Sequence, residues 1–181
     1  MKLRHLIVAG SLLSVGLIGA VHAQDTGRRA QELVAALDKN KYKSKEKKGI
    51  KVEVYVDIKN EAVVKSDPSE YSGTYADEMG LDRLELRVSA DGRVDGKGVE
   101  SESEQKPLQY TLRDARVDGA LLSGTRVFAD GRTDKFEAVF VNQTRKSGTN
   151  ASKIDTEEKM FGLGYIETDG EWTSRVFMAK K

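Results

Sequence analysis

The chain has 181 residues, no cysteine and only two histidines, His5 and His22. Its 30 basic and 29 acidic residues are nearly balanced. This balance does not indicate nucleic acid as a principal partner, because nucleic-acid binding surfaces carry an excess of lysine and arginine. The absence of cysteine excludes disulfides and thiolate metal sites.

The first 23 residues have the three-part layout of a secretory signal peptide. Lys2 and Arg4 form a basic start, residues 6–20 are apolar, and small or apolar residues precede Gln24. This apolar run is shorter than the roughly 20 residues that a membrane-spanning helix needs. We therefore expect cleavage between Ala23 and Gln24, a periplasmic or secreted protein, and no membrane span in the mature chain.

Cleavage at this position would remove both histidines. Ser-His-Asp and Cys-His hydrolysis need a histidine base, and zinc, haem and copper sites commonly need His or Cys ligands. We therefore expect a non-enzymatic protein without a cofactor. A hydrolase that uses paired carboxylates is the remaining enzymatic alternative, with Asp114, Glu137 and Glu167 as candidate residues.

The segment from Asp25 to about Asn40 has the spacing of an amphipathic helix. Asp25 or Thr26 can cap its start. The face predicted to pack on the rest of the protein is formed by the apolar residues Ala30, Leu33, Val34 and Leu37.

Residues 39–48 contain six lysines and one glutamate. One interpretation is the solvated end of the helix leading into a loop, where cations suit the helix dipole. The other is a docking patch for an acidic protein or an anionic polymer. The patch would consist of Lys41, Lys43, Lys45, Lys47 and Lys48.

From Ile50 the hydrophobic period changes from helical to two. Apolar and polar residues alternate as far as Ile58, which predicts a strand with one apolar face. Lys59-Asn60 is a candidate turn into a second strand that ends before Pro68. We therefore expect an N-terminal hairpin over residues 50–65.

After Pro68, five Asp-Gly pairs separate short runs of alternating apolar residues. Asp-Gly favours tight hairpins, because glycine adopts positive φ without steric cost. No helix-length apolar segment intervenes, so the pattern predicts an antiparallel meander. The polar segment 143–158 is predicted to be a long loop. Eight strands are expected near residues 71–76, 82–90, 93–99, 108–115, 120–128, 132–142, 160–167 and 171–179.

Eight short strands in series favour a closed up-and-down barrel, because closure removes exposed strand edges. Gly73-Thr74-Tyr75 and the Asp-Gly hairpins resemble the texture of small lipocalin-like and avidin-like barrels, without matching a specific family motif. The predicted fold is mainly β, with an N-terminal helix before the meander. The expected layout is a signal peptide (1–23), the helix and lysine-rich segment (24–48), and a β domain (49–181) with its meander at 71–179.

Two predicted strands carry apolar residues on both faces. Phe136, Ala138 and Phe140 alternate with Val139 and Val141, so both sides of this strand avoid water. Part of the barrel exterior must then be covered. The helix and the strand at 50–58 are the expected covers, and a second copy in a homodimer is the alternative.

An eight-stranded barrel can hold one small molecule or be filled by its own side chains. Our first hypothesis is a binding protein that holds a small apolar or amphipathic ligand in the barrel mouth. Its walls would be Tyr75, Tyr110, Phe140 and Trp172, with Arg113 as the polar anchor. The alternative is an envelope or secreted interaction module that binds a protein or an anionic polymer through the lysine-rich segment.

Overall fold

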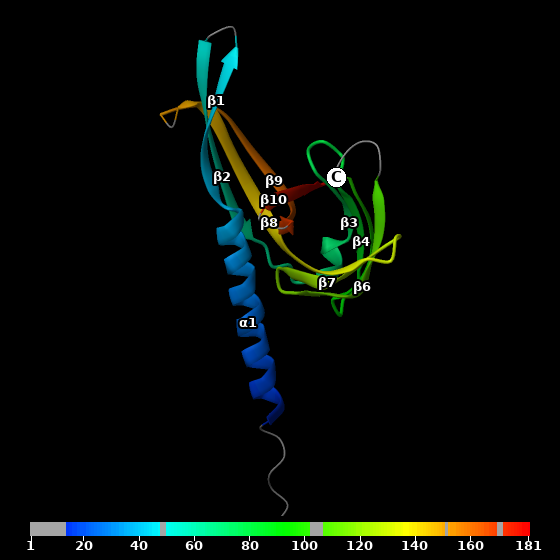
Figure 1. The fold of residues 1–181 in the computed structure, drawn as a ribbon. Coiled ribbons are helices and arrows are strands. Elements are labelled where there is room, and N and C mark those ends of the chain that lie inside the picture. The colour runs from blue at the N-terminus through cyan, green and yellow to red at the C-terminus, as the bar shows by residue number, and fades with distance from the viewer. Residues whose placement is uncertain (1–13, 48–49, 102–106, 151, 170–171) are drawn as a thin grey trace, which may run out of the picture.

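The chain folds into one long helix followed by an antiparallel β-barrel with an extension (Figure 1). The computed structural model describes residues 14–47, 50–101, 107–150, 152–169 and 172–181. It describes only the backbone at 14–24, 39–47, 50–54, 168–169 and 172–173. The elements are α1 (Ser14–Leu37), β1 (Lys39–Lys47), β2 (Ile50–Ala62), the 3-10 helix η1 (Pro68–Tyr71), β3 (Gly73–Ala76), β4 (Arg83–Val88), β5 (Arg93–Glu100), β6 (Leu108–Asp118), β7 (Leu121–Phe128), β8 (Thr133–Asn150), β9 (Lys153–Asp169) and β10 (Trp172–Lys180).

Strands β3 to β10 form a closed eight-stranded antiparallel barrel, which confirms the predicted fold class. Each strand pairs with the next one along the chain, and β10 pairs with β3 to close the barrel. Three predicted Asp-Gly turns are confirmed by positive φ at Gly92, Gly119 and Gly131. The pair Asp95-Gly96 lies inside β5 instead, so its prediction as a turn was wrong. Gly170 lies outside the described residues.

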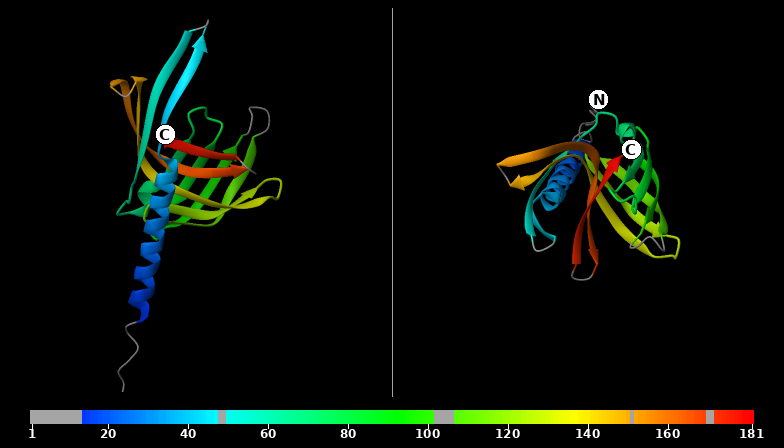
Figure 2. Two further views of the ribbon diagram at one scale, coloured as in Figure 1. Left: turned by 60° about the vertical axis from the view of Figure 1, so that its left-hand side comes forward. Right: turned by 90° about the horizontal axis from the view of Figure 1, so that it is seen from above.

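Strand β8 belongs both to the barrel and to a second sheet region. Its first half pairs with β7, and its second half, residues 141–148, pairs with β2. The β9 strand follows β8 along the other side. We call β1, β2 and the distal parts of β8 (141–150) and β9 (153–162) the extension (Figure 2). The predicted loop at 143–158 was therefore wrong: residues 143–150 and 153–158 form strands. Polar residues are tolerated there because this part of the sheet lies outside the barrel core.

The two N-terminal strands also differ from the prediction. β2 runs without a break through Lys59-Asn60, so the predicted hairpin at 50–65 was wrong. Its hairpin partner is β1, formed by the lysine-rich segment that was expected to be a helix end or loop. Lysines at every second position, from Lys39 to Lys47, have the period of a strand. Lysine is also a common residue on edge strands, where it discourages pairing with other chains.

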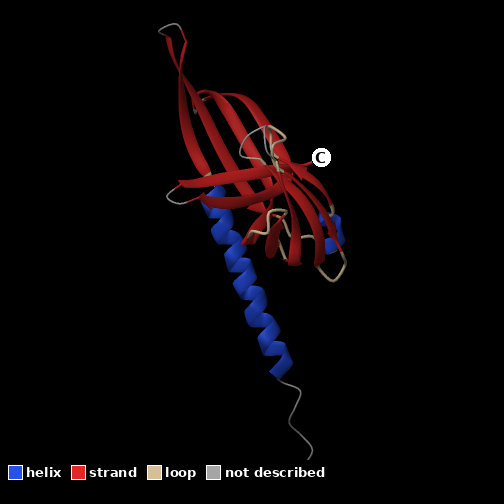
Figure 3. Cartoon of the chain, turned by 45° about the vertical axis from the view of Figure 1, so that its right-hand side comes forward, coloured by secondary structure: helices blue, strands red, loops and turns tan. Residues whose placement is uncertain are grey.

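Helix α1 covers the barrel exterior, as predicted (Figure 3). β2 does not act as a cover, because it lies beside β8 in the sheet. The helix begins at Ser14, so in the full chain Asp25 and Thr26 lie within it rather than at its cap. Within the described residues, no helix is both long and apolar enough to cross a bilayer. The contact joins Ala30, Leu33, Val34 and Leu37 to Ala120, Leu121, Val139 and Val141.

One end of the barrel is sealed by η1. The ring of Tyr71 stacks on Phe140 with 4.0 Å between centroids. Its hydroxyl lies 2.8 Å from the carbonyl oxygen of Val63 and 2.9 Å from that of Gly119, and it accepts a hydrogen bond from the Lys65 amide. Tyr71 is fully buried, so this plug joins the linker after β2 to the β6–β7 turn.

Candidate functional site

The interior of the barrel is a packed core, and three of the predicted wall residues belong to it. Tyr75, Tyr110 and Phe140 are all buried in one apolar cluster. The Tyr75 hydroxyl donates to the carbonyl oxygen of Tyr71 at 2.5 Å. Burial raises the pKa of both Tyr75 and Tyr110. Trp172 starts β10, but its side chain lies outside the described residues.

Arg113 does not lie with these residues. Its side chain is 64% exposed on the barrel exterior, 3.6 Å from Asp114. Tyr110 and Leu112 are buried in the core cluster, so Arg113, one residue further along the strand, points outward. The prediction of Arg113 as the polar anchor of an internal site was therefore wrong.

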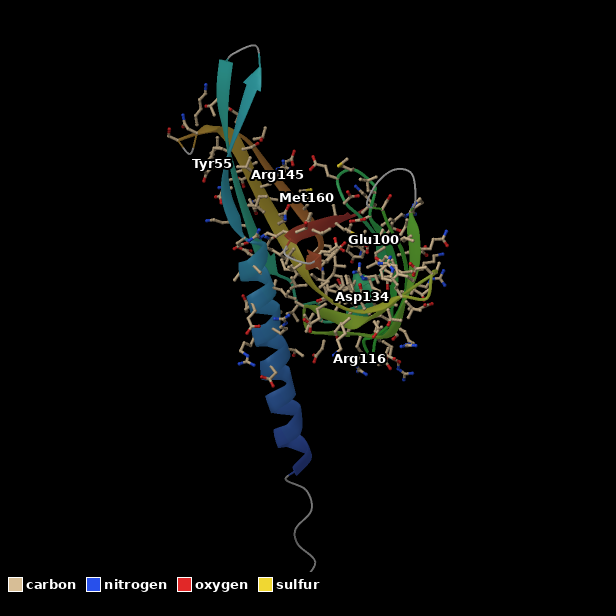
Figure 4. The ribbon with its side chains drawn as sticks, in the orientation of Figure 1. Tyr55, Glu100, Arg116, Asp134, Arg145 and Met160 are labelled. Carbon is tan, nitrogen blue, oxygen red and sulfur yellow. The ribbon has the colours of Figure 1, made fainter. Side chains whose placement is uncertain are left out.

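The cation inside the barrel is Arg126 of β7, which the sequence reasoning missed. Its side chain is only 9% exposed, and it forms a bidentate ion pair with Asp134 at 2.9 and 2.7 Å. Glu100 lies 2.5 Å and Glu167 3.6 Å from its Nη1 (Figure 4 labels Glu100 and Asp134). The guanidinium also lies within 5.6 Å of the ring centroid of Tyr110, and close to two further rings, those of Phe128 and Phe136. The sequence feature that could have revealed Arg126 is its position two residues before the apolar Phe128, because alternate residues of a strand lie on the same face.

This cluster holds more negative than positive charge. Burial raises the pKa of Asp82, Glu100 and Glu167, and neighbouring carboxylates add to that shift. The attraction of Arg126 opposes it. Because the guanidinium is shared among several carboxylates, we interpret Arg126 as a tie between β5, β7, β8 and β9 rather than an anchor for a ligand.

The three carboxylates considered for a hydrolase do not meet. Asp114 is exposed on the outside, and its side chain is 85% accessible to solvent. Glu137 also faces outward and accepts hydrogen bonds from Arg29 of α1 at 2.9 and 2.7 Å. Only Glu167 points into the barrel, towards Arg126. The predicted trio therefore cannot act on one bond.

Outside the barrel, a groove of about 560 Å³ lies where the extension leaves it. We call it the junction groove. Its volume is within the range of small-molecule sites, about 300–1,000 Å³. Figure 4 labels two of its residues, Arg145 on β8 and Met160 on β9. The lining comes from α1 and β2 (Leu37, Ile58), β8 and β9 (Gln143, Arg145, Glu158, Met160), β10 and the C-terminus (Arg175, Val176, Phe177, Ala179, Lys181), and the segment from β3 into the β3–β4 loop (Ala76, Asp77, Glu78, Met79, Asp82).

The lining combines apolar side chains with ionised groups. Ile58, Met160 and Phe177 are half-buried, and Met79 is 77% exposed. The Glu78 carboxylate lies 3.2 Å from the Arg145 guanidinium, which ties the β3–β4 loop to β8. Such a surface suits a molecule with both an apolar and a charged part.

Hydrogen bonds between distant elements hold the walls of the junction groove in place. The Asp38 carboxylate accepts from the backbone and the side-chain amide of Asn60 at 2.7 and 3.0 Å. Gln143 donates to Asn60 at 3.0 Å, which joins the end of α1 to β2 and β8. On the far side, Arg175 donates to the carbonyl oxygen of Ala36 at 2.5 Å. Asn60, predicted as a turn residue, therefore positions the groove.

The lysine-rich segment begins at this groove. In the strand register, Lys39 of β1 is opposite Ile58 of β2, which is opposite Arg145 of β8. Lys41, Lys43, Lys45 and Lys47 follow along β1. Their side chains lie outside the described residues, as does the whole of Lys48.

A scan of protein-family models, a search of curated proteins and a search of solved structures found no match to this chain. The function is therefore inferred from the geometry of the sites described above.

Proposed function

We propose that the protein is an exported, non-enzymatic binding protein that holds a small anionic amphiphile, such as a fatty acid, in the junction groove. The observation that supports this most directly is the groove itself, about 560 Å³ with apolar and ionised groups side by side. The packing of the barrel supports this location, because the barrel interior is occupied by its own core.

The apolar part of the ligand would lie across Ile58, Met160 and Phe177. Burying a hydrocarbon chain there removes its surface and that of the lining side chains from water, at about 25 cal/mol per Å². Met79 and Met160 favour such contact, because methionine side chains are flexible and adapt to irregular ligands.

The anionic head would be held at the side of the groove that leads to β1. Arg145, Arg175 and Lys181 line the groove, and the register puts Lys39 beside Ile58. The acidic lining residues are concentrated in the segment 77–82, apart from Glu158. A carboxylate head near the extension would therefore share Arg145 with Glu78, which pairs with it from the β3–β4 loop, and would be repelled by Asp77 and Asp82.

Export is supported by the signal-peptide layout and is compatible with the packing of α1. The helix side chains that pack on the barrel are Ala30, Leu33, Val34 and Leu37, all beyond the expected cleavage site after Ala23. Cleavage would leave this contact intact. N-terminal sequencing of the protein from its own host should begin at Gln24; a start at Met1 would contradict the proposal.

The test of the groove is binding of cis-parinaric acid, a fluorescent fatty acid whose emission rises in apolar surroundings. We expect Met160→Asp to weaken binding at least tenfold, because a carboxylate would face the ligand chain. The matched control is Ile154→Asp on the same strand, since Ile154 is 39% exposed and is not among the residues that line the groove. Equal affinities for the two variants would contradict the proposed site.

A second pair of variants, at two exposed positions, distinguishes loss of the groove from loss of folding. Met79 and Val64 are both highly exposed, at 77% and 70%, but only Met79 lines the groove. Met79→Asp should weaken binding of the probe, and Val64→Asp should not. Native mass spectrometry of the protein from its host should show a retained small molecule, and release of a stoichiometric protein instead would favour the interaction-module alternative.

A further inference from the structure

The β1–β2 hairpin has two faces of different chemistry. Antiparallel partners that lie opposite each other share a face of the sheet. The register pairs each alternate lysine of β1 with an aliphatic residue of β2, from Lys39 with Ile58 to Lys47 with Ile50. We call this side the lysine–aliphatic face; it contains Lys39, Lys41, Lys43, Lys45 and Lys47 with Ile50, Val52, Val54, Val56 and Ile58.

The opposite face has a different charge. It holds only one lysine, Lys51, against three acidic residues, Glu46, Glu53 and Asp57. The excess positive charge of the hairpin is therefore on the lysine–aliphatic face. That face includes no acidic residue, whereas the remaining positions of the other face are polar or aromatic: Asn40, Tyr42, Ser44 and Tyr55.

The outer part of the hairpin extends beyond the rest of the protein. β8 pairs with β2 only from Tyr55 to Ala62, so residues 50–54 pair with β1 alone. In Figures 1 and 3 the described part of the hairpin projects from the sheet, and no other drawn element lies over its outer end. The described start of α1 lies at the opposite end of the molecule (Figure 1).

We propose that the lysine–aliphatic face docks on an anionic lipid bilayer. Lysine ammonium groups interact with anionic headgroups, while lysine alkyl stems can lie along apolar surface. Valine and isoleucine beside them enter the apolar boundary of the bilayer. On the projecting part of this face, Lys43, Lys45 and Lys47 with Ile50, Val52 and Val54 supply both requirements, whereas Val56 is buried and Ile58 lines the junction groove.

The aliphatic residues distinguish a membrane from other anionic partners. A soluble anionic polymer would use the lysines but would make no use of Ile50, Val52 and Val54 beside them. Pairing of β1 with the edge of a second copy is opposed by the repulsion between two rows of lysines. This inference does not rest on the proposed function, since docking requires no ligand in the junction groove.

The test is flotation of the full protein with vesicles of phosphatidylcholine alone or with 30% phosphatidylglycerol added. We expect binding only to the anionic vesicles, with release as the salt concentration rises. The triple variant Lys41→Gln, Lys43→Gln and Lys45→Gln should lower the partition coefficient at least tenfold. Its control, Lys59→Gln, Lys97→Gln and Lys135→Gln, loses the same charge elsewhere and should bind as the wild type does.

A second variant tests the aliphatic half of the face. Val52→Asn with Val54→Asn keeps every lysine and should also lower vesicle binding at least fivefold, while Val64→Asn, at an exposed position outside this face, leaves it unchanged. Circular dichroism confirms that each variant is folded. Equal vesicle binding by the lysine triple and its control overturns the proposal. So does binding to dextran sulfate without binding to vesicles, or a lysine-dependent dimer in native mass spectrometry without binding to vesicles.

Discussion

The barrel and the extension are built from the same two strands, β8 and β9, but bury them differently. In the barrel half of β8, Phe136, Ala138 and Phe140 face the core while Val139 lies under α1. In the extension half, beyond Val141, polar residues predominate, among them Gln143 and residues 144–147. Because the barrel is closed, each of its strands has a hydrogen-bonded partner on both edges. The apolar residues of β8 are buried on both faces, by the core and by α1. The extension instead keeps an edge strand, β1, and a face that begins at the junction groove.

The largest difference between the two regions should appear in stability. Phe140→Ala removes a fully buried ring that stacks on Tyr71, and should lower the free energy of unfolding by about 3–5 kcal/mol. Ile154→Ala in the extension, at a side chain that is 39% exposed, should lower it by about 0.5 kcal/mol or less. Urea denaturation measures both values. Similar losses would show that the extension is packed as firmly as the barrel.

The charge cluster around Arg126 should be the next most sensitive. Arg126→Met leaves Glu100, Asp134 and Glu167 without their shared cation. We expect a loss of about 2–3 kcal/mol, below the 3–5 kcal/mol typical of a fully buried pair, because these carboxylates are partly exposed. The control is Arg113→Met, which should change the unfolding free energy by about 0.5 kcal/mol or less. A neutral effect of Arg126→Met would contradict its role as a tie.

The contact between α1 and the barrel depends on the absence of a side chain at Gly164. A Cβ there would overlap with Cδ1 of Leu37. Gly164→Ala should therefore destabilise the protein by about 1–3 kcal/mol through overpacking. Leu37→Ala with Gly164→Ala should cost less than the sum of the two single changes, as measured in a double-mutant cycle. Additive losses would mean that the two residues do not meet.

The smallest expected effect is on the pH dependence of stability. The raised pKa values of Asp82, Glu100 and Glu167 mean that the folded state binds their protons more tightly than the unfolded state. The free energy of unfolding should therefore rise as the pH falls from above these folded pKa values towards the unfolded values near 4. Denaturation of Glu100→Gln with Glu167→Gln should show a flatter curve over this window. An unchanged slope would contradict the contribution of these groups.

Stability should fall again in stronger acid, because other carboxyl groups are shifted the opposite way. Hydrogen bonds from Ser89 and the Arg93 backbone lower the pKa of Asp91 to about 2, and similar turn contacts lower those of Asp67 and Asp130. The stability that these groups contribute is present above their unfolded pKa values. It is lost as the pH falls below about 4 towards their folded values.

The candidate sites were only partly predictable. Tyr75, Tyr110 and Phe140 were correctly grouped inside the barrel, because alternation along a strand assigns residues to faces. Arg113 was assigned to the wrong face, and Arg126 was missed although it lies on the same face of its strand as Phe128. The junction groove could not be predicted from the sequence, because its lining comes from elements far apart in the chain, from Leu37 to Lys181.

What the sequence by itself determined is the local structure of the barrel: alternating apolar residues specified eight strands, and Asp-Gly pairs specified three of their turns, because period and turn chemistry act over a few residues. The alternation of Val139 and Val141 with Phe140 also predicted that another element must pack on the outer face of this strand. Only the tertiary structure decided that residues 39–47, 143–150 and 153–158 become strands, since polar segments form sheet when a partner strand supplies their hydrogen bonds. Pairing between distant segments is a property of the whole fold, and it is this pairing that creates both the extension and the groove beside it.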